Sequence, residues 1–133
     1  PEYLKKHAST AISEIVNAAV EDAKSARIEA MNELKMYILV RSDIGLGHQV
    51  NCVAHAAASA ILTWDKDETF ENWKNYSFRK VTCSVTRGQF EEAKQYSDRL
   101  IISEDVLNDT EVAMVFKPRE DWPEFFKKLR LLG

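Results

Sequence analysis

Lys35-Met-Tyr-Ile-Leu-Val-Arg-Ser-Asp-Ile-Gly-Leu-Gly-His-Gln-Val-Asn-Cys-Val-Ala-His-Ala-Ala-Ala-Ser-Ala-Ile-Leu-Thr-Trp64 is the stretch of sequence that decides the fold class. Its first seven residues are apolar and β-branched without helical spacing, which is typical of a strand buried on both faces. Residues 42–47 read as a loop with two glycines. Residues 48–64 are rich in alanine, which favours a helix lying close against a sheet. A strand, a loop and a close-packed helix form half of a βαβ unit.

The rest of the chain extends this pattern to an α/β domain. After a surface connection at 65–71, with a possible helical turn through Phe70 and Trp73, we expect strands, helices and a polar loop in the order strand 78–86, helix 89–99, strand 100–102, loop 103–109, strand 110–117 and closing helix 118–132. Strands separated by helices, followed by two adjacent strands, predict a three-layer α/β fold with a four-stranded mixed sheet between helices.

Residues 1–34 form a separate periodic segment in front of this domain. Apolar residues recur there at steps of three and four, which predicts one amphipathic helix or two. A continuous helix would be about 45 Å long, longer than the domain is wide, so we expect part of it to project or to break. We therefore divide the chain into an N-terminal helical extension, 1–34, and a domain, 35–133. Packing on the chain's own domain is the preferred interpretation of the extension. A homodimer through this helix and a partner-binding arm remain open.

Composition narrows the function classes. A chain of 133 residues suits one domain, and its net charge of −3 argues against coating nucleic acid by bulk electrostatics, so any such contact must be local. Two cysteines are too few for a disulfide framework, and no secretory leader is evident, so we expect a reducing, cytoplasmic setting. The longest apolar run, 50–64, is interrupted by polar residues, which argues against a membrane segment.

The Gly45-Leu46-Gly47 loop lies where a strand passes into a helix N-terminus. The free N–H groups and the positive end of the helix dipole at such a place can hold a phosphate or an oxyanion. The commoner use of such glycines is a tight turn that needs positive φ, and we prefer that reading from the residues alone.

His48, Cys52 and His55 share one face of the predicted helix. Such a face can ligate a soft metal or pair a thiol with a base. Three ligands from one helix are cramped, and we expect no metal. Cys52 reads better as a small core residue, and His55, among alanines, as a buried histidine with a polar partner. For His48 the sequence supports a functional role and a structural role about equally.

Charged residues fall at the predicted strand ends. Glu104 and Asp105 follow the third strand and reach the glycine loop if strands one and three end at the same edge, where either is a candidate general base or hydrogen-bond acceptor. Basic residues can gather at one rim of the sheet, although an ordinary solvated surface is the default reading. These basic residues are Arg41, Arg79, Lys80, Arg87, Lys117 and Arg119.

Residues 37–41, the following Ser42-Asp43-Ile44, the glycine loop and His55-Ala56-Ala57 resemble the archaeal and eukaryotic (type 2) peptidyl-tRNA hydrolases. In that family a strand ending in Arg-x-Asp-Leu leads through a glycine- and lysine-rich loop to a helix with Gln-x-x-His-Ala-Ala. The similarity covers roughly residues 35–132. Aligned on His55, the family's lysine falls at His48 and its glutamine at Cys52, so this chain resembles a divergent member.

The resemblance implies a four-stranded mixed sheet and hydrolysis, without a cofactor or metal, of the ester that joins a peptide to tRNA. It implies that His48, with the N–H groups of Gly47 and His48, contacts the terminal phosphate or the ester oxyanion. Asp105 or Glu104 would orient the attacking water. Asn51 would bind substrate or fix the loop, and Asp43 would shape the turn. The implied substrate-binding set is Gly45, Gly47, Cys52, His55 and Arg41.

Two functions remain open at this point. The first is hydrolysis of peptidyl-tRNA or a related tRNA ester, with acylated tRNA as the partner. The second is a catalytically inactive domain that binds a protein or small ligand and uses the N-terminal helix for association. Binding that weakens with salt would indicate the first, because phosphate contacts release counterions.

Overall fold

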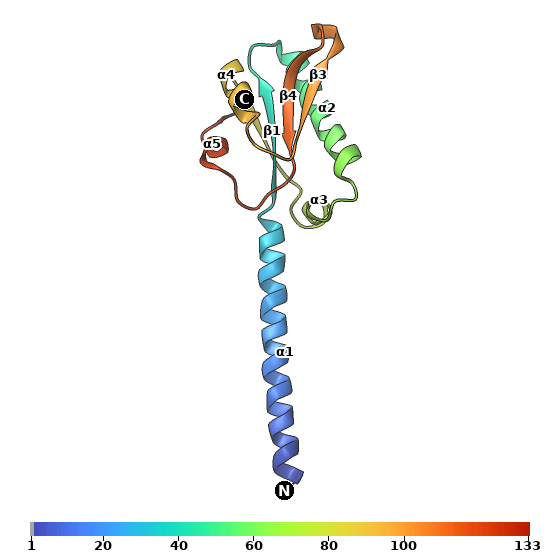
Figure 1. The fold of residues 1–133 in the computed structure, drawn as a ribbon, viewed down its shortest axis with the longest axis vertical. Helices are drawn as coiled ribbons and strands as arrows, with labels where there is room; N and C mark the ends of the chain where they lie inside the picture. Colours follow the sequence, from blue (N-terminus) through green and yellow to red (C-terminus); the bar gives the residue numbers. More distant parts are fainter. Residues whose placement is uncertain (1) are drawn as a thin grey trace.

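The computed structural model describes the backbone of residues 2–133 and the side chains of residues 10–133. Helix α1 (Glu2–Asn32) extends away from an α/β domain as a single rod (Figure 1). Every side chain from residue 10 to residue 29 is exposed, and partial burial begins only in the last turn of the helix, at Ala30. The prediction that this helix packs on its own domain is therefore wrong for the described residues. The division after residue 34 remains a prediction.

The domain is built on a mixed sheet of five strands in the order β3-β4-β1-β2-β5. The central strand β1 (Lys35–Arg41) pairs in parallel with β2 (Arg79–Val85) and antiparallel with β4 (Thr110–Phe116). Strand β3 (Arg99–Glu104) is antiparallel to β4, so it runs in the same direction as β1. The carboxyl ends of β1, β2 and β3 therefore lie along one edge, which we call the carboxyl edge.

The predicted strand count was one too low, because the expected closing helix is mostly absent. Helix α5 (Glu124–Lys127) is one turn long, and the chain then pairs with β2 as the short strand β5 (Arg130–Leu131). The last residues gain backbone hydrogen bonds from the sheet that an exposed helix end would have left to water. Strand β1, in contrast, has the predicted bounds, and its residues from Met36 to Arg41 are buried.

Two apolar clusters lie between the sheet and the helices, one on each face of the sheet. On one face, α2 (Leu46–Trp64), α3 (Glu68–Asn72) and the π-helical turn η1 (Trp73–Ser77) cover Met36, Ile38 and Val40. On the other, α4 (Arg87–Ala93) and α5 cover Tyr37 and Leu39. Alternate β1 side chains thus point to opposite clusters, as the period of a strand requires.

Segment 65–71 is more than the surface connection that the sequence predicts. The rings of Phe70 and Trp73 are fully buried and stack 5.1 Å apart, and the Trp73 indole N–H donates to the carbonyl of Arg79. Their contacts anchor the far end of α2 to the start of β2. Within residues 2–133, no helix is both long and apolar enough to cross a membrane.

Candidate functional site

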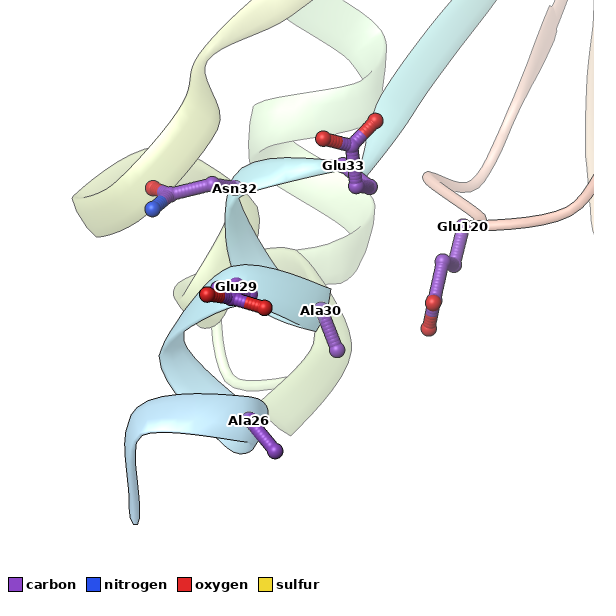
Figure 2. A pocket seen from close by; sticks show the side chains of 6 residues that line it. All are labelled: Ala26, Glu29, Ala30, Asn32, Glu33 and Glu120. Carbon is purple, nitrogen blue, oxygen red and sulfur yellow. The ribbon is translucent and has the colours of Figure 1, made fainter. Parts of the chain in front are cut away.

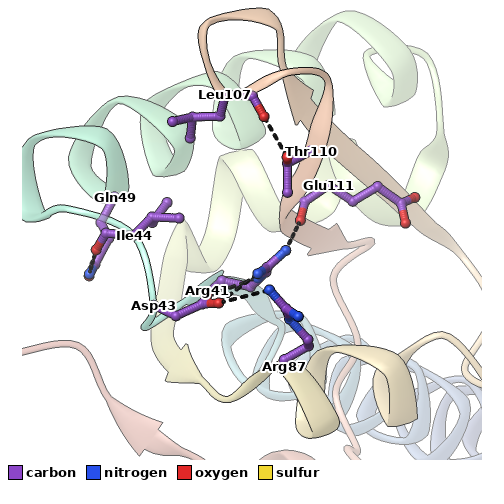
Figure 3. A network of polar contacts seen from close by, with 8 residues as sticks. All are labelled: Arg41, Asp43, Ile44, Gln49, Arg87, Leu107, Thr110 and Glu111. Carbon is purple, nitrogen blue, oxygen red and sulfur yellow. Dashed lines mark hydrogen bonds and ion pairs between the residues drawn. The ribbon is translucent and has the colours of Figure 1, made fainter.

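Arg41 ends the central strand inside a polar network at the carboxyl edge (Figure 3). Its guanidinium donates two hydrogen bonds to the Asp43 carboxylate, at 2.9 and 2.6 Å, and a third, at 3.1 Å, to the backbone carbonyl of Glu111. The Arg41 side chain is only 9% exposed. These contacts fix the turn that follows β1. They also place Arg41, a predicted substrate-binding residue, in an internal role that leaves little of it for a ligand.

Asp43 balances this buried charge from the surface side. The hydrogen bonds from Arg41 hold the pKa of the Asp43 carboxyl below its ordinary value, with a smaller contribution from the charge of Arg87. Arg87, at the start of α4, places its Nη2 atom 3.5 Å from the same carboxylate. The predicted role of Asp43 in shaping the turn agrees with this arrangement.

The glycine loop does not need its glycines for backbone reasons. Gly45 has φ −60° and ψ 149°, and Gly133 alone among the described glycines has a positive φ. The interpretation of these residues as a turn that requires positive φ is therefore wrong. A Cβ at Gly47 would meet no atom within 4 Å, so this side of the helix is open. Absence of a side chain at Gly47 thus leaves room for a close approach from outside.

The first turn of α2 is uncapped at this point. Gly45 stands at the N-cap without a side chain, and Gln49 turns its amide back to the carbonyl of Ile44 instead. The first N–H groups of a helix have no intrahelical partner, so those of the first turn of α2 face the open side with the positive end of the dipole. His48 and Asn51 are exposed on the same turns, as a substrate-contacting role requires.

Two exposed apolar side chains that the sequence reasoning missed flank this turn. Leu46 and Val50 are one helical turn apart and are 69% and 56% exposed. Leu46 also lines a cavity of about 330 Å³ at the carboxyl edge, together with Ser42, Gln49, Ser84, Arg130 and Leu132. Arg130 lies in strand β5 and brings a positive charge to this cavity. The sequence predicts a helix for this segment instead.

Glu104 is the last residue of β3 and interacts with two of the predicted site residues on α2, His55 and Cys52. Its Oε1 lies 3.1 Å from Nδ1 of His55, and its charge, after burial, contributes to raising the pKa of the Cys52 thiol. His55 is 50% exposed, so the prediction of a buried histidine is wrong. Cys52 is buried, as its interpretation as a core residue predicts, and its 1% exposure leaves no surface for the substrate-binding role that the resemblance implies. Glu104 and His55 are both candidates from the sequence, but their contact is visible only in the fold.

Asp105 has a different local role from its neighbour. Its carboxylate accepts a hydrogen bond from the N–H of Val106 and closes the short 3-10 turn η2 (Asp105–Leu107). Glu104 instead points to helix α2 and is only 20% exposed. Of the two carboxylates left open by the sequence, Glu104 is therefore the one held beside the predicted site residues.

The basic residues lie at two edges of the sheet, so the alternative that they gather at one rim is wrong and the default of an ordinary surface stands. Arg41 and Arg87 lie at the carboxyl edge, but Arg79 and Lys80 begin β2 at the opposite edge. At that opposite edge Arg119 bridges to Lys35, and two residues earlier in the chain Lys117 pairs with an aspartate ahead of α3. The antiparallel direction of β4 is the reason, because it carries residues 117–119 to the start of β1. Among the side chains from residue 10 onward, no three His, Cys, Asp or Glu groups are placed to hold a metal ion.

Both cysteines are expected to resist alkylation in the native protein. Burial raises the pKa of the Cys83 thiol to about 11, and burial is also the main cause of the raised pKa of Cys52. Because the thiolate is the reactive form, iodoacetamide at pH 8 should modify neither residue until the protein unfolds. Mass spectrometry with and without denaturant measures this directly. Rapid modification of Cys52 in the folded chain would contradict its role as a core residue.

The family model described as peptidyl-tRNA hydrolase PTH2 matches residues 34–132, which include all five strands. No curated protein matches the chain at a significant level.

Proposed function

The chain belongs to the peptidyl-tRNA hydrolase PTH2 family, and we propose that it hydrolyses the ester between the peptide and the 3′ ribose of peptidyl-tRNA, releasing free tRNA. The observation that carries the proposal is the family match over residues 34–132. The open, uncapped start of α2 supports it, because a phosphate or a developing oxyanion can approach the N–H groups at Gly47 and His48.

The acylated 3′ end of tRNA is the proposed partner, and the cytoplasm, where translation takes place, is the proposed setting. The overall charge of −3 does not favour a broad nucleic-acid surface, so binding must rest on a few phosphates. The carboxyl edge offers Arg130 in its cavity, His48 on the first turn of α2, and the dipole of that helix. Leu46 and Val50 supply apolar surface for the terminal base or for the peptide.

We assign the activation of the attacking water to Glu104. His55 holds the Glu104 carboxylate in place. The water oxygen attacks the ester carbonyl carbon while Glu104 accepts one proton from the water. The N–H groups of the α2 start stabilise the oxyanion that forms. The bond to the 3′ oxygen then breaks, and the proton returns from Glu104 to that oxygen, which leaves a 3′ hydroxyl and the free carboxylic acid of the peptide.

Release of labelled peptide from N-acetyl-aminoacyl-tRNA tests the proposal. With about two phosphate contacts, kcat/KM should fall about sevenfold between 50 and 200 mM salt. His48→Ala should lower turnover about tenfold without changing the unfolding midpoint, because the side chain is exposed. Peptide release no faster than the spontaneous rate would overturn the proposal.

Gly47→Ala and Gly88→Ala make a matched pair for the same assay. Each glycine is the second residue of its helix, and neither added Cβ would come closer than 3.9 Å to another atom of the protein. Both variants should fold as the wild type does, with slightly better helix propensity. Only the methyl group at Gly47 should obstruct the substrate. Equal turnover in the two variants would contradict substrate approach at the start of α2.

A further inference from the structure

A heptad pattern runs along the exposed length of α1. Its members follow one another at alternating steps of four and three residues, the spacing that keeps one face of a helix toward a second helix. They are Ile12, Val16, Ala19, Ala23, Ala26 and Ala30, and we call them the seam. Ile12 and Val16 are 62% and 54% exposed, so the domain does not cover them.

The helix is long for a segment whose side chains are exposed from residue 10 to residue 29. Its 31 residues extend about 47 Å, and most helical stability in proteins comes from packing of an apolar face rather than from propensity. The alanines in the seam have small side chains, so a second helix can lie close to its backbone. These two features require a covering element but do not identify it.

The residues beside the seam identify the occupant and its direction. In a parallel pair of identical helices, a residue on one flank meets the residue five positions later on the other helix. This rule brings Ile15 beside Val20 of the partner subunit and Asp22 beside Arg27 of the partner subunit. The first contact extends the apolar seam, and the second joins opposite charges.

The antiparallel arrangement offers no such match. In that arrangement each flank meets the same flank of the second helix, so Asp22 would face Ile15, Asp22 or Glu29, and Arg27 would face a residue of its own flank. Ser13 and Val20 are the other members of that flank, and neither is acidic. Complementary charge therefore exists for the parallel pair alone.

The base of the seam also leaves space for a second helix. A cavity of about 410 Å³ opens there, and Figure 2 shows Ala26 and Ala30 turned to the side on which Glu120 lies. Glu29 and Glu33 line the same cavity and add negative charge on this side. The seam thus stays open as far as this cavity.

We propose that α1 pairs with α1 of a second copy of this chain as a parallel two-stranded coiled coil, which holds two α/β domains at the same end. This proposal stands apart from the hydrolase activity, because none of its residues lies at the carboxyl edge.

Sedimentation velocity of the 133-residue chain between about 1 and 200 µM is the test, since a dimer depends on protein concentration. The mass should rise from 15.2 kDa toward twice that value. Val16→Glu, in the seam, should abolish the rise. Ile28→Glu is the matched control, because Ile28 is 45% exposed but lies on the side of the helix away from the seam.

A charge exchange tests the direction of the pair. Asp22→Lys and Arg27→Glu should each weaken the dimer, and the double variant should restore it, because the opposite charges meet again. A monomer at every concentration would overturn the proposal, and so would a dimer that Val16→Glu leaves intact. Equal loss in the double variant and the single variants would overturn the parallel arrangement.

Discussion

Glu104→Gln should lower kcat for peptidyl-tRNA hydrolysis about a hundredfold and leave KM nearly unchanged. Removing a positioned acid or base commonly costs between 10² and 10⁴ in rate. The amide has the shape of the carboxylate and keeps an oxygen toward Nδ1 of His55, 3.1 Å away in the wild type. It cannot take a proton from water, so the loss should appear in the chemical step rather than in binding.

Asp105→Asn is the control for that experiment. Asp105 is exposed, and its carboxylate accepts the hydrogen bond from the Val106 N–H within η2, which an asparagine oxygen can also accept. Its turnover should stay within about twofold of the wild type. A hundredfold loss in Asp105→Asn with none in Glu104→Gln would move the water-activating role to Asp105. Unchanged unfolding midpoints in both variants would separate catalysis from stability.

His55→Ala tests whether His55 positions the Glu104 carboxylate, and its expected effect is smaller. Without its ring, Glu104 keeps its charge but loses the contact that orients it, so kcat should fall about tenfold. His55→Gln offers a similar polar contact and should recover part of the loss. A structural role alone would lower the unfolding midpoint in both variants and would leave kcat of the folded enzyme unchanged.

The sequence predicted the central strand well and the contacts between distant segments poorly. Strand β1 carries its own signal, because a strand buried on both faces is an unbroken apolar run. The pairing of His55 with Glu104 joins residues 49 positions apart, and the bond from Arg41 to the Glu111 carbonyl joins residues 70 apart. Such contacts depend on strand order, which no local pattern contains.

The closing segment shows a second limit of sequence reasoning. Its acidic start and basic end fit the helix dipole, which favours a helix. Residues 130–131 nevertheless pair with Cys83 and Ser84, because β2 has a free edge whose N–H and C=O groups need partners. Arg130 consequently reaches the cavity at the carboxyl edge. The cavity was unpredictable for the same reason.

Asp43→Ala should lower the free energy of unfolding by about 2 to 3 kcal/mol, more than Arg41→Met does. Removing one partner of a buried ion pair leaves the other charge without compensation, at a cost of about 3 to 5 kcal/mol for a fully buried pair. Arg41 is 9% exposed and would keep its charge, whereas Asp43 is 43% exposed and can be solvated. This exposure places the expected loss below the fully buried range and makes the two single variants unequal.

Urea unfolding of both single variants and of the double variant measures this coupling. The double variant should lose less unfolding free energy than the two single variants lose together, because it removes the buried charge together with its partner. Equal losses for Asp43→Ala and Arg41→Met would contradict the assignment of Arg41 as the buried member.

Acid should reproduce the same loss in the wild type. The pKa of Asp43 is lowered in the folded state, so its contribution to stability is complete above the ordinary carboxyl value of 3.8 and disappears as pH falls through the lower folded value. The unfolding free energy of the wild type should therefore decrease more steeply below pH 3.8 than that of Asp43→Asn. Parallel curves for the two proteins would contradict a lowered pKa of Asp43 in the folded state.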